Sequence, residues 1–157
     1  MELNQCINFL LTKAQQAVLQ YFRARLAAFD ITPVQYGILS CLWAEDGQTP
    51  TQIAQKLCLD GSTITGILDR MESKGLLTRT PDPEDRRAVR VVLTERSLRL
   101  MEPINEVISA SNRDVLKIFS DEEQAQLKNF LERISQHKPA PPAGNHGHSA
   151  RNSSRHA

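Results

Sequence analysis

The chain has 157 residues, of which 40 % are hydrophobic and 24 % are charged, a balance typical of one soluble globular domain. Its formal net charge is only +1. This excludes binding to nucleic acid through bulk positive charge, so any such contact must come from where the arginines sit. No apolar run reaches the ~18 residues that span a membrane, and no secretory pattern opens the sequence. We therefore expect a cytoplasmic protein with no membrane partner.

Two helices are predicted in the first part of the chain. Apolar residues recur at spacings of three and four over residues 3–29, which predicts one long helix. Its apolar face is wide for a small domain, so we expect it to serve partly as an interface. Thr32 and Pro33 then supply an N-cap and a first-turn proline for a helix over residues 34–44. Apolar side chains surround that second helix, which indicates burial on several sides.

A second pair of helical patterns follows. Thr49 and Pro50 repeat the cap-then-proline arrangement and open a third helix, which the sequence Asp60-Gly61-Ser62 ends. A fourth helix is predicted from Ser62 to Lys74, with Gly75 placed to end it in a left-handed conformation. The side chains expected to face inward from this fourth helix are Ile64, Ile67, Leu68 and Met71.

The next segment alternates like the two strands of a hairpin. The strands are predicted over Leu76–Thr80 and Ala88–Leu93, with Val89, Val91 and Leu93 on one face. The intervening Pro81–Arg87 segment is too rich in proline and charge to be strand, so it is the expected loop.

The remainder is predicted to be helical and then unstructured. Thr94 caps a long helix that runs to about Phe119, and Ser120 opens a last helix with a capping box that reaches about Gln136. The composition then shifts to a segment without apolar periodicity, which predicts a disordered tail over residues 137–157 after a folded domain over residues 1–136.

The outer face of the fourth helix is suited to enter a DNA groove. It carries small or polar groups without a bulky side chain in its first two turns, a profile that lets a recognition helix reach base edges or phosphates. The competing interpretation is an ordinary solvated helix face. The candidate DNA-binding residues on this helix are Ser62, Thr63, Thr65, Gly66, Asp69 and Arg70.

The predicted hairpin loop ends in two arginines, Arg86 and Arg87. A loop of this size can project arginine into a narrow minor groove, where the negative potential is strongest. Carboxylates nearby would repel phosphate, so we expect Asp60 and Asp85 to support the wing by holding the arginine forks through bidentate pairing. The alternative is a solvated turn with local ion pairs of little energetic value.

The order of elements, the segment LDGSTITGILDRMESKGLLTR and the segment DPEDRRAVRVVLT resemble the MarR family of bacterial winged helix-turn-helix regulators. The resemblance implies a mainly α fold with a small β-hairpin wing, flanked by dimerisation helices. It implies a homodimer on an inverted-repeat operator in double-stranded DNA, with the recognition helix in the major groove and Arg87, beside Arg86, in the minor groove. It also implies a repressor released by a small-molecule effector or by thiol oxidation.

The thiol mode would use Cys6. Peroxide-sensing members of the family carry a reactive cysteine near the start of the first helix, supported by tyrosines, but those supporting positions here hold Thr12 and Phe22. The nearby cation is Lys13, two helical turns away, which leaves little to lower the pKa of the thiol. Cys41 and Cys58 lie in apolar helical patterns and are expected to be small core residues.

The effector mode would use a crevice between the first two helices, the fifth helix and the DNA-binding lobe. The resemblance suggests that the residues lining it are Lys13, Tyr36 and Trp43, with Arg23 further along the first helix. An aromatic cleft that contains a cation suits an anionic aromatic ligand or an acyl thioester.

Enzymatic chemistry is not expected. The folded part contains no nucleophile and base arrangement, no glycine-rich phosphate loop and no metal-ligand spacing, so we expect neither catalysis nor a cofactor or metal. A winged-helix module for protein contacts is the remaining alternative, but it should carry apolar anchors on the fourth helix where this sequence has Ser62, Thr63 and Thr65.

Overall fold

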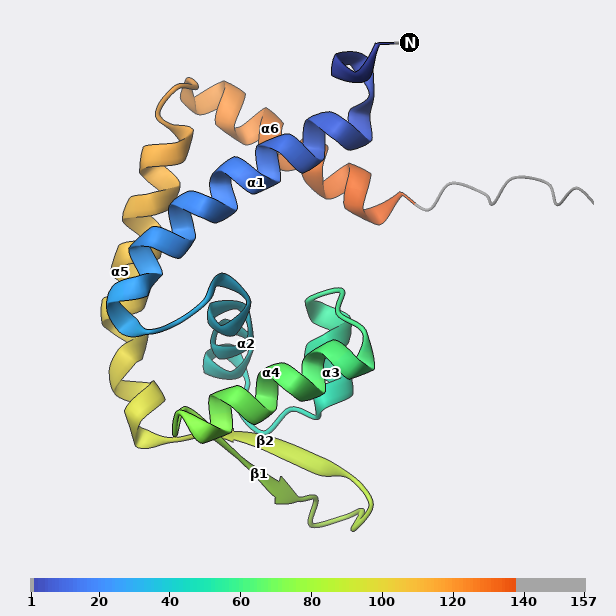
Figure 1. Cartoon of the computed structure of the whole chain (residues 1–157), viewed down its shortest axis with the longest axis vertical. Helices are drawn as coiled ribbons and strands as arrows, with labels where there is room; N and C mark the ends of the chain where they lie inside the picture. The colour runs from blue at the N-terminus through green and yellow to red at the C-terminus, as the bar shows by residue number, and fades with distance from the viewer. Residues whose placement is uncertain (1, 138–157) are drawn as a thin grey trace, which may run out of the picture. The chain divides into compact units, whose positions relative to one another are not determined.

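The computed structural model describes residues 2–137, and most of them are helical (Figure 1). The described chain divides into two compact units, the first ending at Lys117 and the second beginning at Ile118. The elements are η1 (Leu3–Gln5), α1 (Ile7–Leu26), η2 (Ala27–Phe29), α2 (Pro33–Ala44), α3 (Pro50–Lys56), α4 (Gly61–Ser73), β1 (Leu77–Pro81), β2 (Val89–Leu93) and α5 (Glu95–Leu116) in the first unit, and α6 (Asp121–Gln136) in the second. The expected fold class, mainly α with a β-hairpin wing, is confirmed.

Side-chain caps start the helices where the sequence predicts them. Thr32, Thr49 and Ser120 each accept a hydrogen bond from the backbone N–H three residues later, and the side chain at that later position accepts one in return. Thr94 forms the same reciprocal box at the start of α5. Each box satisfies N–H groups that a helix leaves without an internal partner.

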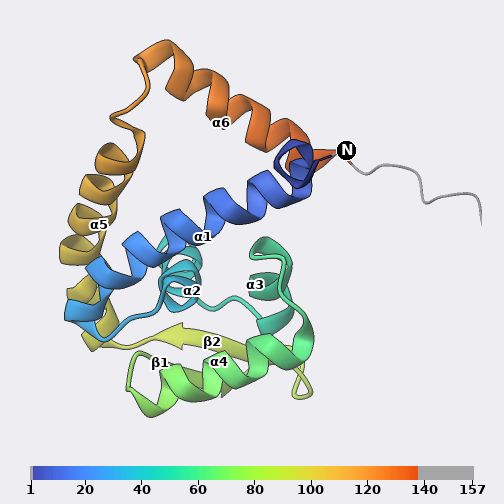
Figure 2. The same cartoon turned by 45° about the horizontal axis from the view of Figure 1, so that its top comes forward.

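The hairpin has two strands of five residues each, joined by the loop of residues 82–88. β1 and β2 are antiparallel, with Leu77 opposite Leu93 and Pro81 opposite Val89. Gln48, in the turn between α2 and α3, forms an additional bridge to Val91. Backbone hydrogen bonds between this turn and Val91 therefore join the helix-turn-helix to the middle of β2. Figure 2 shows α2, α3 and α4 beside the hairpin.

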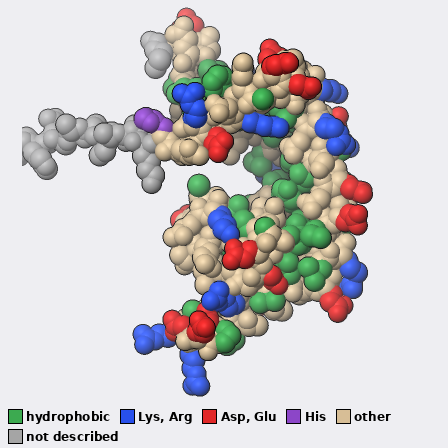
Figure 3. Space-filling model, turned by 180° about the vertical axis from the view of Figure 1, so that it is seen from behind, with side chains coloured by type: hydrophobic (Ala, Val, Ile, Leu, Met, Phe, Trp, Pro, Cys, Tyr) green, Lys and Arg blue, Asp and Glu red, His purple; other side chains and the backbone are tan. Residues whose placement is uncertain are grey.

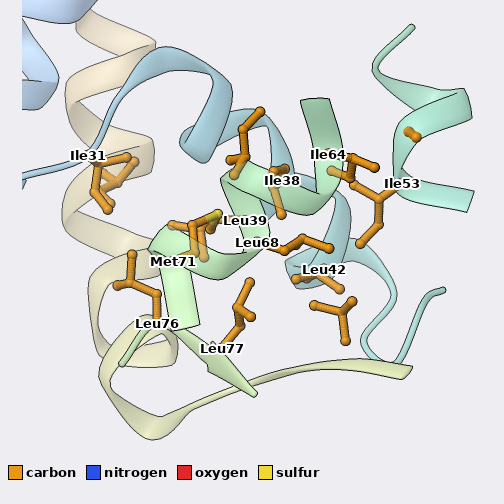
Figure 4. Close-up of a cluster of buried hydrophobic side chains, with 14 of the residues drawn as sticks. Ile31, Ile38, Leu39, Leu42, Ile53, Ile64, Leu68, Met71, Leu76 and Leu77 are labelled. Atoms are coloured by element: carbon orange, nitrogen blue, oxygen red, sulfur yellow. The ribbon is translucent and has the colours of Figure 1, made fainter. Parts of the chain in front are cut away.

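The core of the first unit lies between α2, α4 and the hairpin. Ile64, Ile67, Leu68 and Met71 are all buried, as predicted for the inner face of α4. They pack with side chains of the neighbouring elements, among them Ile31, Ile38, Leu39, Leu42, Ile53, Leu76 and Leu77 (Figure 4). The position of α4 is thus set by apolar packing, and its outer face is left for other contacts.

Several boundaries differ from those expected. The helix predicted over residues 3–29 is interrupted at Cys6, which is extended, and α1 ends at Leu26 before the short η2. Pro81 is the last residue of β1 and not part of the loop. The helix after Thr94 ends at Leu116, not Phe119.

One burial prediction is wrong. Cys58 is exposed and adopts a left-handed conformation (φ 54°) in the turn after α3, so it is not a core residue. Cys58 follows the apolar pattern of its segment, but the chain has already turned away from the core at this position. In β2, Val91 is buried, whereas Val89, two residues earlier, is 38 % exposed.

Within the described residues, no helix combines the length and apolar character needed to cross a membrane. The predicted tail, apart from His137, lies outside the described residues.

Candidate nucleic-acid interface

Asp60 is the N-cap of α4, the helix predicted to enter a DNA groove. Its carboxylate accepts hydrogen bonds from Thr63 N (2.7 Å), Ser62 Oγ (2.7 Å) and Thr63 Oγ1 (2.8 Å). These hydrogen bonds, the backbone one first, lower the pKa of Asp60 to about 2. The prediction that Asp60 holds an arginine fork is therefore wrong, because its acceptor capacity is turned toward the first turn of its own helix.

The outer face of α4 presents small groups, as the sequence predicts. Ser62, Thr63 and Thr65 are exposed, and Thr65 Oγ1 donates to Gly61 O at 2.8 Å. A hydroxyl that donates one hydrogen bond keeps lone pairs on its oxygen, so these groups can still accept from a base edge. Gly66 adds no side chain to this face, which keeps the helix narrow. A Cβ added there would lie 3.8 Å from Arg70 Nη1, an ordinary contact distance, so the packing does not require glycine at this position.

The two charged candidates on α4 face other parts of the protein. Asp69 forms an ion pair with Arg79 of β1, at 2.7 Å. Arg70 lines a hollow toward α1 and α2. Their assignment as DNA-binding residues stays a prediction. In the free protein, Asp69 is paired with Arg79 and Arg70 lines this hollow.

The wing loop is held by backbone hydrogen bonds and leaves its arginines exposed. Asp85 accepts from Arg87 N at 3.0 Å, and Ala88 N donates to Asp85 O at 2.9 Å. Arg86 and Arg87 are both exposed at the loop tip. Lys and Arg side chains project from the hairpin end of the space-filling view (Figure 3). Asp85 supports the wing through the backbone of the loop, and the prediction that it holds an arginine fork is wrong.

The carboxylate that does pair with an arginine in the wing is Asp82, which was not among the predicted residues. Its Oδ2 lies 2.6 Å from Arg90 Nε, and Arg90 Nη1 also donates to Gly47 O at 3.1 Å. Hydrogen bonds from the Glu84 backbone and from Arg90 lower the pKa of Asp82. The hairpin register could have indicated this pair, because Thr80 lies opposite Arg90 and so places residue 82 within reach of it.

The four predicted effector residues are not brought to one site. Tyr36 and Trp43 lie together, with ring centroids 6.4 Å apart, and Trp43 Nε1 donates to Ser97 O. Lys13 is exposed on α1. Arg23 instead lines a hollow of about 420 Å³ with Leu19, Thr32, Pro33, Val34, Gln35, Ile67 and Arg70. Cys6 is partly buried beside the start of α1.

No group of three or more His, Cys, Asp or Glu side chains that could hold a metal ion occurs among residues 2–137. The arrangement of a capped helix with a small polar outer face, followed by an arginine-tipped hairpin, is that of a winged helix-turn-helix DNA-binding protein.

Comparisons with known proteins agree with this class. The model of the MarR family matches residues 31–89. The regulator PecS of Dickeya dadantii is 32 % identical over 131 residues, which cover 83 % of this chain and 76 % of PecS. The organic hydroperoxide resistance regulator of Bacillus subtilis is 35 % identical over 102 residues, 65 % of this chain and 69 % of that protein.

Solved structures are similar over most of the chain. The repressor CouR bound to a 23-mer DNA duplex has a TM-score of 0.80 at 26 % identity, covering 86 % of this chain and 96 % of CouR. The regulator PcaV of Streptomyces coelicolor with its natural ligand has a TM-score of 0.76 at 27 % identity, covering 86 % of this chain and 95 % of PcaV. The chain belongs to the MarR family and is a DNA-binding transcriptional regulator.

Proposed function

We propose that the chain is a homodimeric repressor that binds an inverted-repeat operator and releases it when a small anionic aromatic ligand binds. The observation that carries the DNA part is the wing tip. Arg86 and Arg87 project into solvent, on a hairpin adjacent to a recognition helix whose outer face is small and polar. Such an arrangement can address a major and a minor groove together. The DNA duplex bound by the relative CouR supports the same use here.

Uncovered apolar side chains support the dimer. In the first unit, Leu3, Ile7 and Leu10 are exposed at the N-terminal end, and in the second unit Phe130, Leu131 and Ile134 are exposed along α6. Exposed apolar clusters of this kind mark interaction surfaces in soluble proteins. A second copy of the chain provides the same surfaces in a two-fold arrangement.

A direct test combines DNA selection with sedimentation. The protein should select, from a pool of randomised duplexes, an inverted repeat whose half-site centres lie about 10 bp apart, because a two-fold dimer presents two recognition helices one DNA turn apart. Sedimentation should show a dimer at the same concentrations. Footprinting of a single half-site, or a monomer in solution, would contradict the dimeric operator complex.

The hollow beside Arg23 is the candidate effector site. Arg23 from α1 and Arg70 from α4 line it together with apolar side chains that include Val34 and Ile67. Its volume of about 420 Å³ lies within the usual range for small-molecule sites. Two guanidinium groups and apolar walls suit an aromatic carboxylate, and the natural ligand held by the relative PcaV supports a ligand-responsive reading of this fold.

The hollow also gives the ligand a way to act on DNA binding. One wall is α4 itself, through Ile67 and Arg70. A ligand can release DNA only if it binds the DNA-incompetent arrangement more tightly than the competent one, and linkage then requires operator DNA to weaken ligand binding by the same factor.

Replacing Arg23 with alanine should separate effector binding from DNA binding. We expect the concentration of an effective aromatic acid, identified by a thermal-shift screen, to rise about tenfold or more for release of operator, because a charged hydrogen bond of ~1.5–3 kcal/mol is lost. Operator affinity without ligand should be unchanged. Lys13→Ala is the matched control, since Lys13 is a cation on the same helix outside the hollow.

The thiol-sensor alternative predicts the opposite dependence. The similarity to the B. subtilis hydroperoxide regulator is the observation that supports this alternative. Under the ligand proposal, Cys6→Ser leaves the response intact. If Cys6→Ser instead abolished the response, and peroxide released the unmodified protein from DNA, the ligand proposal would fall and the thiol mechanism would stand.

A further inference from the structure

Arg79 of β1 ties the wing to the recognition helix. Its backbone N–H donates to Glu72 Oε1 at 3.0 Å, and its Nε and Nη2 donate to Glu72 Oε2 at 3.1 and 2.7 Å. Nη2 also lies 2.7 Å from Asp69 Oδ1. Asp69 and Glu72 are three residues apart and so share one side of α4. One arginine thereby fixes the first wing strand to the last turns of the helix.

The Arg79 guanidinium is paired with both carboxylates of this cluster, so its single positive charge is fully used within the protein. The hydrogen bonds from Arg79, side chain first and then backbone, lower the pKa of Glu72, and both carboxylates raise the pKa of Arg79. The Arg79 side chain is only 29 % exposed. Its backbone N–H, Nε and Nη2 all face carboxylates of α4, so Arg79 is poorly placed to contact a phosphate itself.

The distal wing has little apolar packing to hold it. Leu77 at the base of the hairpin and Val91 in its middle, opposite Arg79, are fully buried, whereas Val89 and the loop arginines beyond them are exposed. A two-stranded hairpin is marginally stable by itself. The second strand is anchored at its outer end by Arg90 to Asp82 and Gly47. For the first strand, Arg79 makes the corresponding connection to α4.

Groove binding makes the angle of this hairpin important. The recognition helix and the wing tip must enter adjacent grooves of one rigid duplex at the same time. The wing tip is the part of the hairpin farthest from the contact between β1 and α4. A small rotation at the base therefore displaces Arg87 by much more at the tip.

We propose that Arg79 is a positioning residue for DNA binding, which sets the wing relative to the recognition helix, with Asp69 and Glu72 as its anchors. This inference rests on the proposed function, because operator affinity is one of its readouts. It reassigns Asp69 from a groove contact to a support.

A double-mutant cycle tests the proposal. Arg79→Met and Arg87→Ala are made singly and together in the full chain, and affinity is measured on the duplex that the unmodified protein selects from a randomised pool. We expect Arg79→Met to weaken binding about tenfold, the scale of coupling through a shared network. Arg87→Ala should then cost much less in the Arg79→Met background than alone. Arg99→Met is the matched control, because Arg99 forms an exposed ion pair with Glu95 on α5.

A second measurement needs no DNA. Backbone amide exchange in residues 78–92 of the free protein should be faster in Arg79→Met than in Arg99→Met, because the clamp that limits wing opening is gone. Glu72→Gln provides the same test with a smaller change if Arg79→Met does not fold.

The outcomes separate this inference from the proposed function. Independent, multiplicative effects of Arg79→Met and Arg87→Ala, or wing exchange equal to that of the control, would overturn the positioning role. If no duplex were selected, the repressor proposal would fail, while faster wing exchange would still support the clamp and unchanged exchange would still refute it.

Discussion

Replacing Arg87 with alanine is expected to weaken operator binding by ~1–3 kcal/mol. Arg87 lies exposed at the tip of the wing, and its backbone N–H, not its guanidinium, is used to shape the loop. The side chain is therefore available to a narrow minor groove, where a cation gains most from the negative potential. A gel shift at fixed salt concentration measures the change.

The same substitution should leave folding unaffected, because an exposed loop arginine contributes little to the core. Arg99→Ala is a suitable control, since it removes another exposed arginine, which lies on α5 outside the wing. An unchanged operator affinity for folded Arg87→Ala would exclude the role given to this residue. A loss of affinity equal to that of Arg99→Ala would mean that only overall charge matters.

Replacing Leu68 with alanine is expected to lower the free energy of unfolding by about 2–5 kcal/mol, the usual cost of a leucine cavity in a packed core. Leu68 is 1 % exposed and lies on the inner face of α4, within the cluster that Figure 4 shows. The cavity would form directly beneath the recognition helix. Urea denaturation at a fixed protomer concentration gives the change, because the stability of a dimer depends on its concentration.

Leu98→Ala is the matched control for this experiment. Leu98 is 51 % exposed near the start of α5, so its replacement should change the stability by no more than about 0.5 kcal/mol. Equal losses for the two leucines would show that α4 does not depend on the core beneath it. A destabilised Leu68→Ala protein that is still folded should also bind operator less tightly, since part of the population is unfolded or has a displaced helix.

The secondary structure could be predicted from the sequence because its signals are local. Thr32, Thr49, Thr94 and Ser120 all begin helices as expected, since a capping box involves only residues three positions apart. The buried face of α4 follows from its helical period. The left-handed Gly75 (φ 67°) likewise follows from its position after the last turn. The predicted segment ends differ from the observed ones by one residue at Pro81 and by three or four residues at the ends of α1.

The same local rules should have assigned Asp60. It precedes α4 and has Thr63 three residues later, the spacing of an N-cap and the backbone N–H that donates to it. Asp60 was instead predicted to pair with an arginine of the wing. Local hydrogen bonds are the simpler explanation for an acidic residue at a helix start, and Asp60 does accept one from Thr63 N.

The charged pairing was decided by the tertiary structure. Several carboxylates and arginines lie within residues 60–90, and their order along the chain does not say which of them meet. The pairs Asp82 with Arg90 and Glu72 with Arg79 form only because the hairpin register and the packing of β1 against α4 bring them within 3 Å. Likewise, Arg23 and Arg70 are 47 positions apart and line one hollow only because α1, α2 and α4 pack around it. Period and capping therefore determined from the sequence which residues form α4 and the wing, whereas long-range packing decided how their charges are used, since ion pairing depends on distances that the chain acquires only on folding.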